Sequence, residues 1–450
     1  GTAAPSLTVA ERRRYAELAR LSAGDHVSSV LSKLESEWAR AIARAEDEVL
    51  GPLRPLTYAS TRWAMPAAPP TAPVTLVTQC SLDRLPRLRM AAEAWSGPVS
   101  AAVYVPAPKG SVQAAAAEEM LRDELDALGP RAAAQLTIVL LYMPAPEGQH
   151  AGAPAPRLPG SAAEYDALYP INALRNLALD GAPTDLVLLL DVDFVPSAGL
   201  LRDLMHSGAL GAVASSITAL VLPAFEVTPS TPLPRSQAAL ASLVHAGLAS
   251  AFHVAHFPRG HAPTNVARWL AAATPYHVPY EEYYEPYIVA SRSWLPRYDE
   301  RFRGYGMNKV SHLYAVAAAG ATFVVQPAHF VVAHEHAKSG AWEMSAGPAA
   351  NPAHRMRIAA LYRRFKAECP PLPAAQIERS RAEATAPAVV TQGKLSTATK
   401  RAAHQDVHPA GHVKRACQRW PLGAFANGAR RVVRAKARHD MRGMPAGVRA

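Results

Sequence analysis

Residues 186–196 read LVLLLDVDFVP, and this stretch decides how the rest of the chain is interpreted. Five apolar residues run directly into Asp191 and Asp193, and an apolar run without polar alternation indicates a strand buried on both faces. Side chains two positions apart on a strand point the same way, so the two carboxylates repel unless a cation or hydrogen bonds offset their charge. Asp-Val-Asp at the end of such a strand therefore predicts a hard divalent ion, Mn²⁺ or Mg²⁺, held by oxygen ligands.

Apolar strand-like runs alternate with helix-like segments on both sides of this stretch. Strands are expected at 74–80, 97–106, 136–144 and 186–196, with a late pair of strands within 321–336, and helices at about 81–95, 112–128, 169–180, 236–246 and 351–368. The alternation predicts an α/β fold with a mainly parallel central sheet flanked by helices. Ligands of such sheets bind beyond the carboxyl ends of the strands, where Asp191 and Asp193 stand in the sequence.

Length and composition set broad limits on the domain organisation. The chain has 450 residues, 49% hydrophobic and 18% charged, which is enough for one large domain or two ordinary ones. We expect an N-terminal region at 1–73, with a helical stem at 9–50 and a Pro-rich linker at 51–73, then an α/β domain at 74–370 and a disordered tail at 371–450. No apolar run reaches the length of about 18 residues that indicates a membrane helix. The chain begins with Gly1, so a membrane anchor could stand upstream of it.

The net charge of +11 is confined to the C-terminal end of the chain. Residues 391–450 carry 13 Lys and Arg against 2 Asp and Glu, whereas the other 390 residues carry 34 of each kind. A solvated basic extension is the favoured interpretation, and contact with nucleic acid or an anionic surface is the alternative. Nucleic-acid binding is disfavoured because the tail has only Trp420 and Phe425 as aromatic residues and no recognisable nucleic-acid module.

Five stretches of the chain together resemble one enzyme family. LLLDVDFVPS resembles the nucleotide-sugar transferases of the GT-A fold and, more narrowly, glycosyltransferase family 49, the LARGE-type β-glucuronosyltransferases. Matching stretches, in the family's order, are VTLVTQCSLDRLPRL, YPINALRNLAL, YEPYIVASRSWLPRYDERFRGYGMNKVSHLY and FVVQPAHFVVAHEH. The resemblance covers about 74–366. It implies a metal-dependent, inverting transfer of a sugar, with glucuronate favoured, from a UDP-sugar donor to a glycan or glycoprotein acceptor.

The resemblance also implies a set of metal ligands. Asp193 would ligate Mn²⁺ directly, Asp191 would contact the metal through water or bind the ribose, and His336 would be the third protein ligand. The family's commoner ending has a His-x-x-His pattern, and Ala333 stands where its first histidine would be. His334 faces away from Ala333 on a strand, so His336 is the expected ligand. Without the resemblance, His336 would be interpreted as a surface histidine of a polar loop.

Three basic residues are candidates for binding anionic groups. The resemblance places Arg175 near the donor pocket. Lys309 and Arg301 could bind the diphosphate or a uronate carboxylate, which Arg suits through bidentate hydrogen bonds. An ion pair of Arg301 with Asp299 or Glu300 is an equally good interpretation.

The catalytic base is the least determined part of the site. Some related galactosyltransferases follow a Gly-aromatic-Gly turn with Glu-Asp, and that Asp is the base, whereas GYGMNK has Asn308 and Lys309 there. The nearest acidic candidates are Glu285 and Asp299. Glu285 is favoured because it stands among aromatic residues suited to stacking on a sugar ring, namely Tyr283, Tyr284 and Tyr287.

Two other functions remain open at this point. A transferase-like protein that binds glycan or nucleotide without turnover would explain the missing Asp of the GYGMNK segment. A metal-dependent phosphohydrolase could use the same aspartates. For the transferase, the resemblance implies work in the Golgi lumen as a type II membrane protein.

Overall fold

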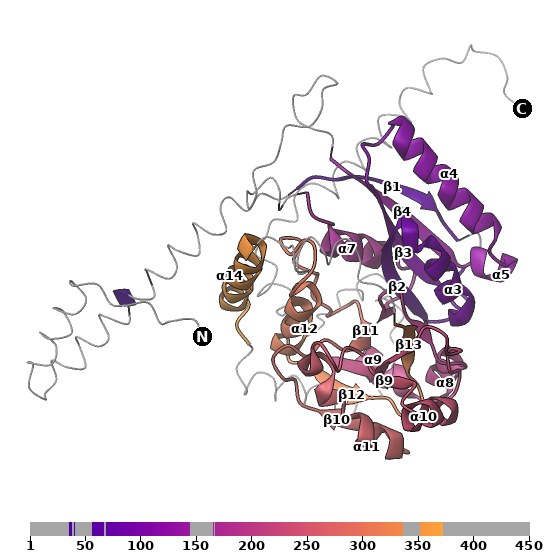
Figure 1. Cartoon of the computed structure of the whole chain (residues 1–450), viewed down its shortest axis with the longest axis vertical. Helices are drawn as coiled ribbons and strands as arrows, with labels where there is room; N and C mark the ends of the chain where they lie inside the picture. The colour runs from indigo at the N-terminus through magenta and orange to yellow at the C-terminus, as the bar shows by residue number, and fades with distance from the viewer. Residues whose placement is uncertain are drawn as a thin grey trace, which may run out of the picture.

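The computed structural model describes residues 36–37, 40, 56–66, 69–144, 165, 167–335 and 352–371. Within these residues the centre is a nine-stranded sheet in the order β1-β4-β3-β2-β5-β11-β7-β12-β10 (Figure 1). Its strands are β1 (Ala59–Ala64), β2 (Val74–Ser81), β3 (Val99–Val105), β4 (Leu136–Tyr142), β5 (Leu186–Leu189), β7 (Thr218–Leu222), β10 (Tyr276–Val278), β11 (Tyr287–Ser291) and β12 (Thr322–Val325). Strands β4, β3, β2 and β5 run parallel, and β11 runs antiparallel to both β5 and β7. The predicted α/β fold is confirmed.

A second, four-stranded sheet and the helices surround this centre. The small sheet has the order β6-β13-β8-β9, with β6 (Val195–Pro196), β8 (Ala224–Val227), β9 (Ala249–Ala251) and β13 (Val331–His334). The α-helices are α3 (Leu85–Trp95), α4 (Val112–Asp126), α5 (Pro130–Ala133), α7 (Ile171–Gly181), α8 (Leu200–His206), α9 (Ala209–Ser215), α10 (Gln237–His245), α11 (Val266–Ala271), α12 (Asn308–Ala318) and α14 (Pro352–Glu368). Helices α3 and α4 lie on one face of the parallel strands and α7 on the other (Figure 1).

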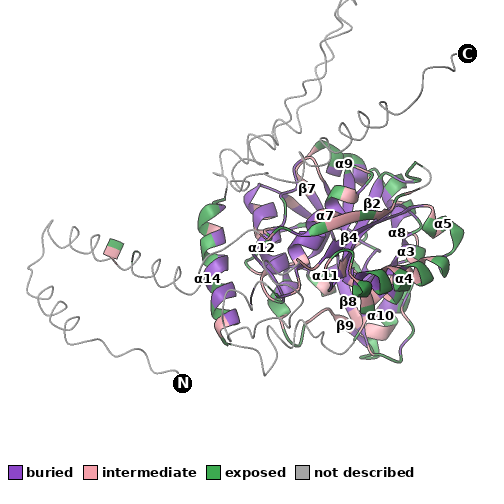
Figure 2. Cartoon of the chain, turned by 90° about the horizontal axis from the view of Figure 1, so that it is seen from above, coloured by how far each residue is buried: buried purple, intermediate pink, exposed green. Residues whose placement is uncertain are grey.

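The helices on both faces of the sheet explain why its parallel strands are apolar. Along β5, Leu186 and Leu188 pack into the hydrophobic cluster that includes α3 and α4, whereas Val187 and Leu189 pack into the cluster that includes α7. Successive side chains of a strand point to opposite faces, so a strand covered on both sides has no place for polar alternation. Strands β2, β3, β4 and β5 are accordingly almost fully buried, while α4 and α5 are exposed on their outer side (Figure 2).

Three features differ from what the sequence analysis expected. Strand β1 forms within the segment 51–73 that was expected to be a linker, and it pairs antiparallel with β4, so that β1 is the edge strand of the large sheet. The predicted late strand pair forms as β12 and β13, but the two strands belong to different sheets. The predicted strand 186–196 is divided, because β5 ends at Leu189 and β6 begins at Val195 in the other sheet.

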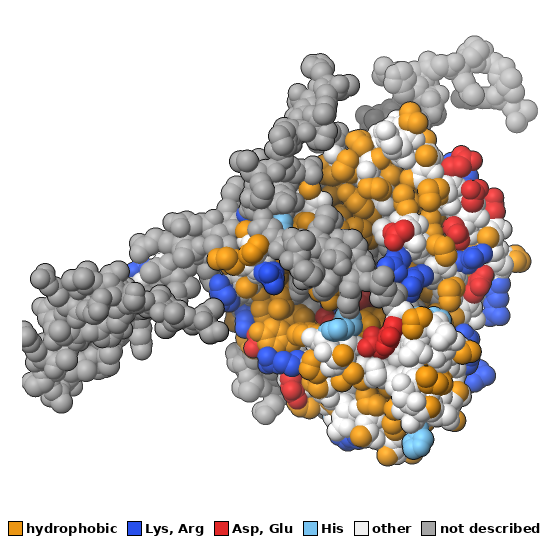
Figure 3. All heavy atoms as spheres, in the orientation of Figure 1, with side chains coloured by type: hydrophobic (Ala, Val, Ile, Leu, Met, Phe, Trp, Pro, Cys, Tyr) orange, Lys and Arg blue, Asp and Glu red, His pale blue; other side chains and the backbone are white. Residues whose placement is uncertain are grey.

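Several predictions concern residues outside the described part of the chain. They include the helix at 9–50 apart from three residues, the site residue His336 and the basic tail from 372 onward. None of the helices in the described part combines the length and hydrophobicity that spanning a bilayer requires. On the face drawn in Figure 3, described acidic and basic side chains lie intermingled, in keeping with the balanced charge of residues 1–390.

Candidate active site

The two aspartates lie on a turn between the two sheets. The amide of Phe194 donates to the carbonyl of Asp191 at 3.1 Å, which closes the turn after β5. Val192, between the aspartates, is buried in the core. The prediction that one strand carries both carboxylates is therefore wrong. The two carboxylates lie on the turn and contact different partners.

Asp191 is the point where three distant segments meet. One of its oxygens accepts a hydrogen bond from Arg175 of α7 at 2.9 Å. The other accepts from the hydroxyl of Tyr287 in β11 at 2.9 Å and lies 3.4 Å from the Lys309 ammonium of α12. Burial alone would raise the pKa of this carboxyl, but the charges of Lys309 and Arg175 and the two hydrogen bonds outweigh it, so the pKa is well below its usual range. Asp191 is therefore a carboxylate at any physiological pH.

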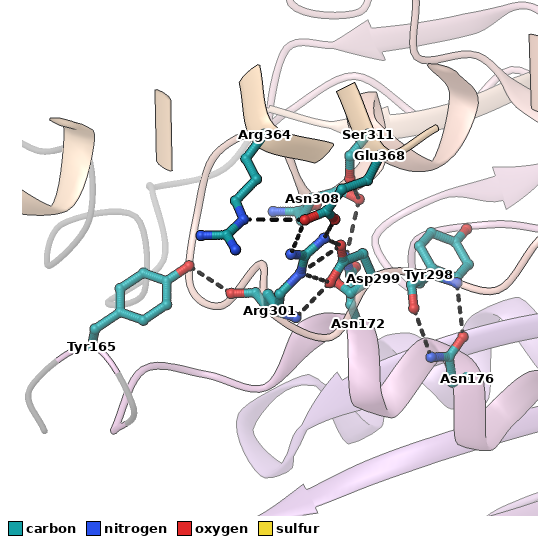
Figure 4. Close-up of polar contacts among 10 residues, drawn as sticks. All are labelled: Tyr165, Asn172, Asn176, Tyr298, Asp299, Arg301, Asn308, Ser311, Arg364 and Glu368. Atoms are coloured by element: carbon teal, nitrogen blue, oxygen red, sulfur yellow. Dashed lines mark hydrogen bonds and ion pairs between the residues drawn. The ribbon is translucent and has the colours of Figure 1, made fainter. Parts of the chain in front are cut away.

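Side chains of helix α7 hold residues 298–308, which lie in the stretch YEPYIVASRSWLPRYDERFRGYGMNKVSHLY and are called the clamped segment below. Asn176 donates to the Tyr298 carbonyl at 2.9 Å and accepts from its amide at 3.0 Å (Figure 4). Asn172 donates to the Asp299 carbonyl at 2.8 Å, and Arg175 donates to the Asn308 side chain at 2.8 Å. The stretches YPINALRNLAL and YDERFRGYGMNK are thus one structural unit.

The Gly-Tyr-Gly turn delivers Lys309 to this unit. Gly304 and Gly306 have φ of 66° and 109°, in the region that favours glycine, and Met307 follows at 53°. Helix α12 then begins, and its first turn directs Lys309 inward, where its ammonium lies 4.1 Å from the centre of the Tyr287 ring. The structure thus brings together Arg175, Lys309 and Asp191, the three residues expected at the donor site, and their role in binding the donor stays a prediction.

Asp193 makes a separate pair of contacts on the other side of the turn. Its Oδ1 lies 3.1 Å from Arg84 and 3.1 Å from Arg87, at the start of α3. The Asp193 side chain is 25% exposed and that of Asp191 is 29% exposed, so the two carboxylates differ in their partners and not in their own exposure. Arg84 and Arg87 are partly exposed, whereas Arg175 and Lys309 are buried. Sequence analysis missed both arginines, although SLDRLPR directly after a strand was a usable signal.

The chemistry of the candidate metal ligands suits a hard divalent ion, but the set of ligands is incomplete in the described part of the chain. Two carboxylates lie on one turn, and oxygen ligands are what Mn²⁺ and Mg²⁺ prefer. Among the described residues no group of three or more His, Cys, Asp and Glu side chains is placed to hold a metal. The expected third ligand, His336, lies outside those residues. Its neighbour His334 bonds the Thr231 carbonyl at 2.9 Å, and so has another contact.

Glu285 is the acidic candidate that lies close to Asp191 and Lys309. It directly precedes Pro286 and β11, and its side chain is half-buried. Burial raises the pKa of the Glu285 carboxyl, an effect opposed by Lys309 and reinforced by the charge of Asp191. A carboxylate with a raised pKa beside this polar cluster is suited to take up a proton.

Two side chains near Glu285 were missed by sequence analysis. His261 is buried with its Nε2 unpartnered, and burial together with the charge of Lys309 holds its pKa well below the usual range, so the ring is neutral. Tyr305, at the tip of the Gly-Tyr-Gly turn, is 39% exposed. Burial of its hydroxyl and the charges of Glu285 and Asp191 raise the pKa of Tyr305 to about 12.

The aromatic residues around Glu285 are placed differently from expectation. Tyr284 and Tyr287 are buried in the core, so neither offers a ring face for stacking on a sugar. Tyr283 is partly exposed and has Arg259 4.5 Å from its ring centre. Tyr305 is exposed, and it lies close enough to Glu285 and Asp191 for their charges to act on its hydroxyl.

Asp299, the second acidic candidate, forms an ion pair with Arg301. Arg301 donates to both of its oxygens, with Nη2 at 2.6 Å, and the same guanidinium reaches Glu368 at the end of α14 at 2.5 Å (Figure 4). The ion-pair interpretation of Arg301 is therefore the one that the structure shows. These contacts link the clamped segment to α14 and commit Asp299 to Arg301.

Replacing Arg301 by alanine should lower the stability of the fold by about 3 kcal/mol, because Asp299 would lose its partner in a largely buried position. Urea unfolding at neutral pH measures the effect. Arg364→Ala is the matched control, since Arg364 is exposed and its contact with Glu368 at 3.1 Å is a surface pair worth about 0.5 kcal/mol. Equal losses in the two variants would contradict a buried role for Arg301.

A small pocket opens beside Asp191. It is bounded by the ends of β2 and β5 and by Arg175, Tyr298 and Lys309. Its volume of about 20 Å³ leaves room for about one water. A single oxygen of a ligand fits this space, whereas a sugar or a nucleoside would lie outside it.

Comparison with known proteins gives a consistent result. A family model described as "Glycosyl-transferase for dystroglycan" matches residues 73–370. The human xylosyl- and glucuronyltransferase LARGE1 is 35% identical over 275 residues, which are 61% of this chain and 32% of that protein. Human LARGE2 is 37% identical over 60% of this chain and 34% of its own length. The chain thus spans about a third of the length of these relatives.

The similarity of this chain to solved structures is weak. Staphylococcus aureus TarS 1-349 in complex with UDP-GlcNAc matches with a TM-score of 0.29 and 12% identity, over 69% of this chain and 70% of that one. A similarity of this size carries no argument about function.

Proposed function

Because the chain belongs to glycosyltransferase family 49, the glycosyl-transferases for dystroglycan, we propose that it transfers a sugar from a UDP-sugar to a hydroxyl of a glycan acceptor. The observation that carries this proposal is the meeting of Arg175, Tyr287 and Lys309 on Asp191, with Glu285 beside them. Glucuronate is the favoured sugar. The relatives' name includes both xylosyl and glucuronyl transfer, so xylose is the first competitor to test.

The proposed metal is Mn²⁺ or Mg²⁺. Asp193 and Asp191, together with His336, would hold it, and it would neutralise charge on the diphosphate as UDP leaves. Asp191, already fixed by three side chains, is suited to an indirect contact or to the ribose. Asp193 is suited to direct ligation, because its arginine partners are partly exposed.

The chain's own residues supply the remaining chemistry. The acceptor oxygen attacks the anomeric carbon, the bond from that carbon to the UDP oxygen breaks with its electron pair leaving on UDP, and Glu285 takes the acceptor's proton. Attack opposite the leaving group inverts the anomeric centre. Arg175 and Lys309 hold Asp191 in place and bring positive charge to the side where the diphosphate would lie.

We also propose the surroundings in which this happens. The division into a stem, a GT-A domain at 74–370 and a basic tail at 371–450 follows the resemblance, as does work in the Golgi lumen with a membrane anchor upstream. A truncation to 56–371 that keeps activity would support this division, and loss of soluble protein on that truncation would contradict it.

A donor panel tests the proposed activity. We expect UDP with Mn²⁺ to raise the melting temperature, and one of UDP-glucuronate, UDP-xylose, UDP-glucose, UDP-galactose or UDP-N-acetylglucosamine to be consumed when an aryl β-xyloside or β-glucuronide is present. A nucleotide at 100 times its Kd adds about 2.7 kcal/mol of stability. Chelation should abolish the turnover.

The same panel separates the rival functions. Equal splitting of UDP-sugar with and without acceptor would indicate a phosphohydrolase. Nucleotide-dependent stabilisation with no turnover of any donor would indicate a binding protein without catalysis.

A further inference from the structure

We propose that Arg84 and Arg87 are a binding pair for the diphosphate of the nucleotide sugar, which Asp193 holds in place until donor and metal arrive. This inference rests on the proposed function and deepens it. It gives a ligand to Arg84 and Arg87, which the sequence patterns did not assign to the site and which are not among the contacts described for Asp191.

The geometry is a shared carboxylate. Both guanidinium groups reach the same oxygen, Oδ1 of Asp193, at 3.1 Å. Arg84 also contacts the exposed Asp83 at 3.3 Å. The arginine side chains are 18% and 29% exposed, so these are partly solvated pairs of modest strength. Such pairs can exchange one anion for another without a large loss of stability.

Metal binding at Asp193 would leave the two arginines without this partner. A divalent cation would then stand beside two guanidinium groups, and their repulsion opposes binding unless an anion arrives with the metal. A diphosphate is such an anion, and guanidinium groups bind phosphate oxygens through paired hydrogen bonds. The arrangement therefore couples metal binding to nucleotide binding.

The coupling predicts that removing the two arginines changes the affinities for Mn²⁺ and for UDP in opposite directions. Without Arg84 and Arg87, Asp193 would lose its competing cations, so Mn²⁺ alone should bind more tightly. UDP would lose two charge-assisted contacts, so UDP in the presence of Mn²⁺ should bind more weakly. Because binding free energies are reciprocally linked, the mutual enhancement of Mn²⁺ and UDP should shrink in both directions.

The experiment uses the full chain carrying Arg84→Gln, Arg87→Gln or both. Binding of Mn²⁺ without nucleotide is measured from the electron paramagnetic resonance signal of free Mn²⁺, and UDP binding by calorimetry at saturating Mn²⁺. In the double variant we expect Mn²⁺ to bind roughly fivefold tighter and UDP roughly a hundredfold weaker. Arg89→Gln is the matched control, since Arg89 lies on the same helix and pairs with Glu124 at 3.6 Å.

The outcomes separate this inference from the proposed function. Unchanged UDP affinity, or weaker Mn²⁺ binding, in variants that melt like the wild type would overturn the role of the arginines alone. Failure of the wild-type chain to bind UDP with Mn²⁺ would overturn the proposed function and this inference together. Effects of Arg89→Gln equal to those of the double variant would reduce the result to net charge and also overturn the inference.

Discussion

Glu285→Gln should lower kcat by about 10²- to 10⁴-fold, the usual contribution of a general base, while UDP binding stays near the wild-type level. Glutamine keeps the size of the side chain but cannot take up the acceptor's proton. Glu285 touches neither Arg175 nor Lys309 in a hydrogen bond that the structure shows, so the cluster on Asp191 should persist. Steady-state transfer rates and calorimetric UDP titration make the two measurements.

The pH dependence of the wild-type enzyme follows from the same residue. The pKa of Glu285 is raised by burial, and a base works only when deprotonated. Activity should therefore fall on the acid side at a pH above the ordinary glutamate value, as Glu285 gains its proton. Glu285→Asp should keep an acid limb, whereas Glu285→Gln should have none.

Glu281→Gln is the control for this prediction, because Glu281 lies in the same loop with an exposed side chain. Retention of more than a tenth of the activity in Glu285→Gln would exclude Glu285 as the base. Asp299 would not then be the natural replacement, since Arg301 binds both of its oxygens.

Local patterns predicted the parts of the fold that depend on one segment at a time. Mostly apolar runs predicted β2, β3, β4 and β5 because burial on both faces removes a regular polar alternation, and β5 shows the two sets of contacts directly. The strand β1 was missed because prolines on both sides suggested a linker. Its formation depends on the edge of β4, a partner far along the chain.

The site was predictable in its residue types and less so in its geometry. Arg175, Lys309 and Asp191 were each expected at the donor site, and the structure brings them into contact, while donor binding itself stays a prediction. The turn after Leu189 could not be foreseen from LVLLLDVDFVP, because a second sheet takes up the residues after the aspartates. The pairing of Asp193 with Arg84 and Arg87 depends on how α3 packs against that turn, which is a tertiary contact.

The difference between the two aspartates gives the last prediction. Asp191→Asn should lower the stability by about 2 kcal/mol, because Arg175 and Lys309 would keep their charges in buried positions without a carboxylate. The estimate lies below the 3 to 5 kcal/mol of a fully buried pair because the Asp191 side chain is 29% exposed. Asp193→Asn should cost less than about 1 kcal/mol, since its partners are partly solvated. Both variants should lose most of the transfer activity.

Urea unfolding as a function of pH tests the assignment of this stability to Asp191. The folded-state pKa of Asp191 is depressed, so its contribution is fully present above the ordinary carboxyl pKa and is lost as the pH falls toward the folded-state value. Asp191→Asn should therefore be less stable than the wild type at pH 7, and the gap should narrow in acid. Asp193→Asn should show little gap at either pH. Equal stability losses in both variants, or a gap for Asp191→Asn that widens in acid, would mean that the cluster of Arg175, Tyr287 and Lys309 does not hold Asp191 as a buried anion, and Asp191 would then be as open to direct metal ligation as Asp193.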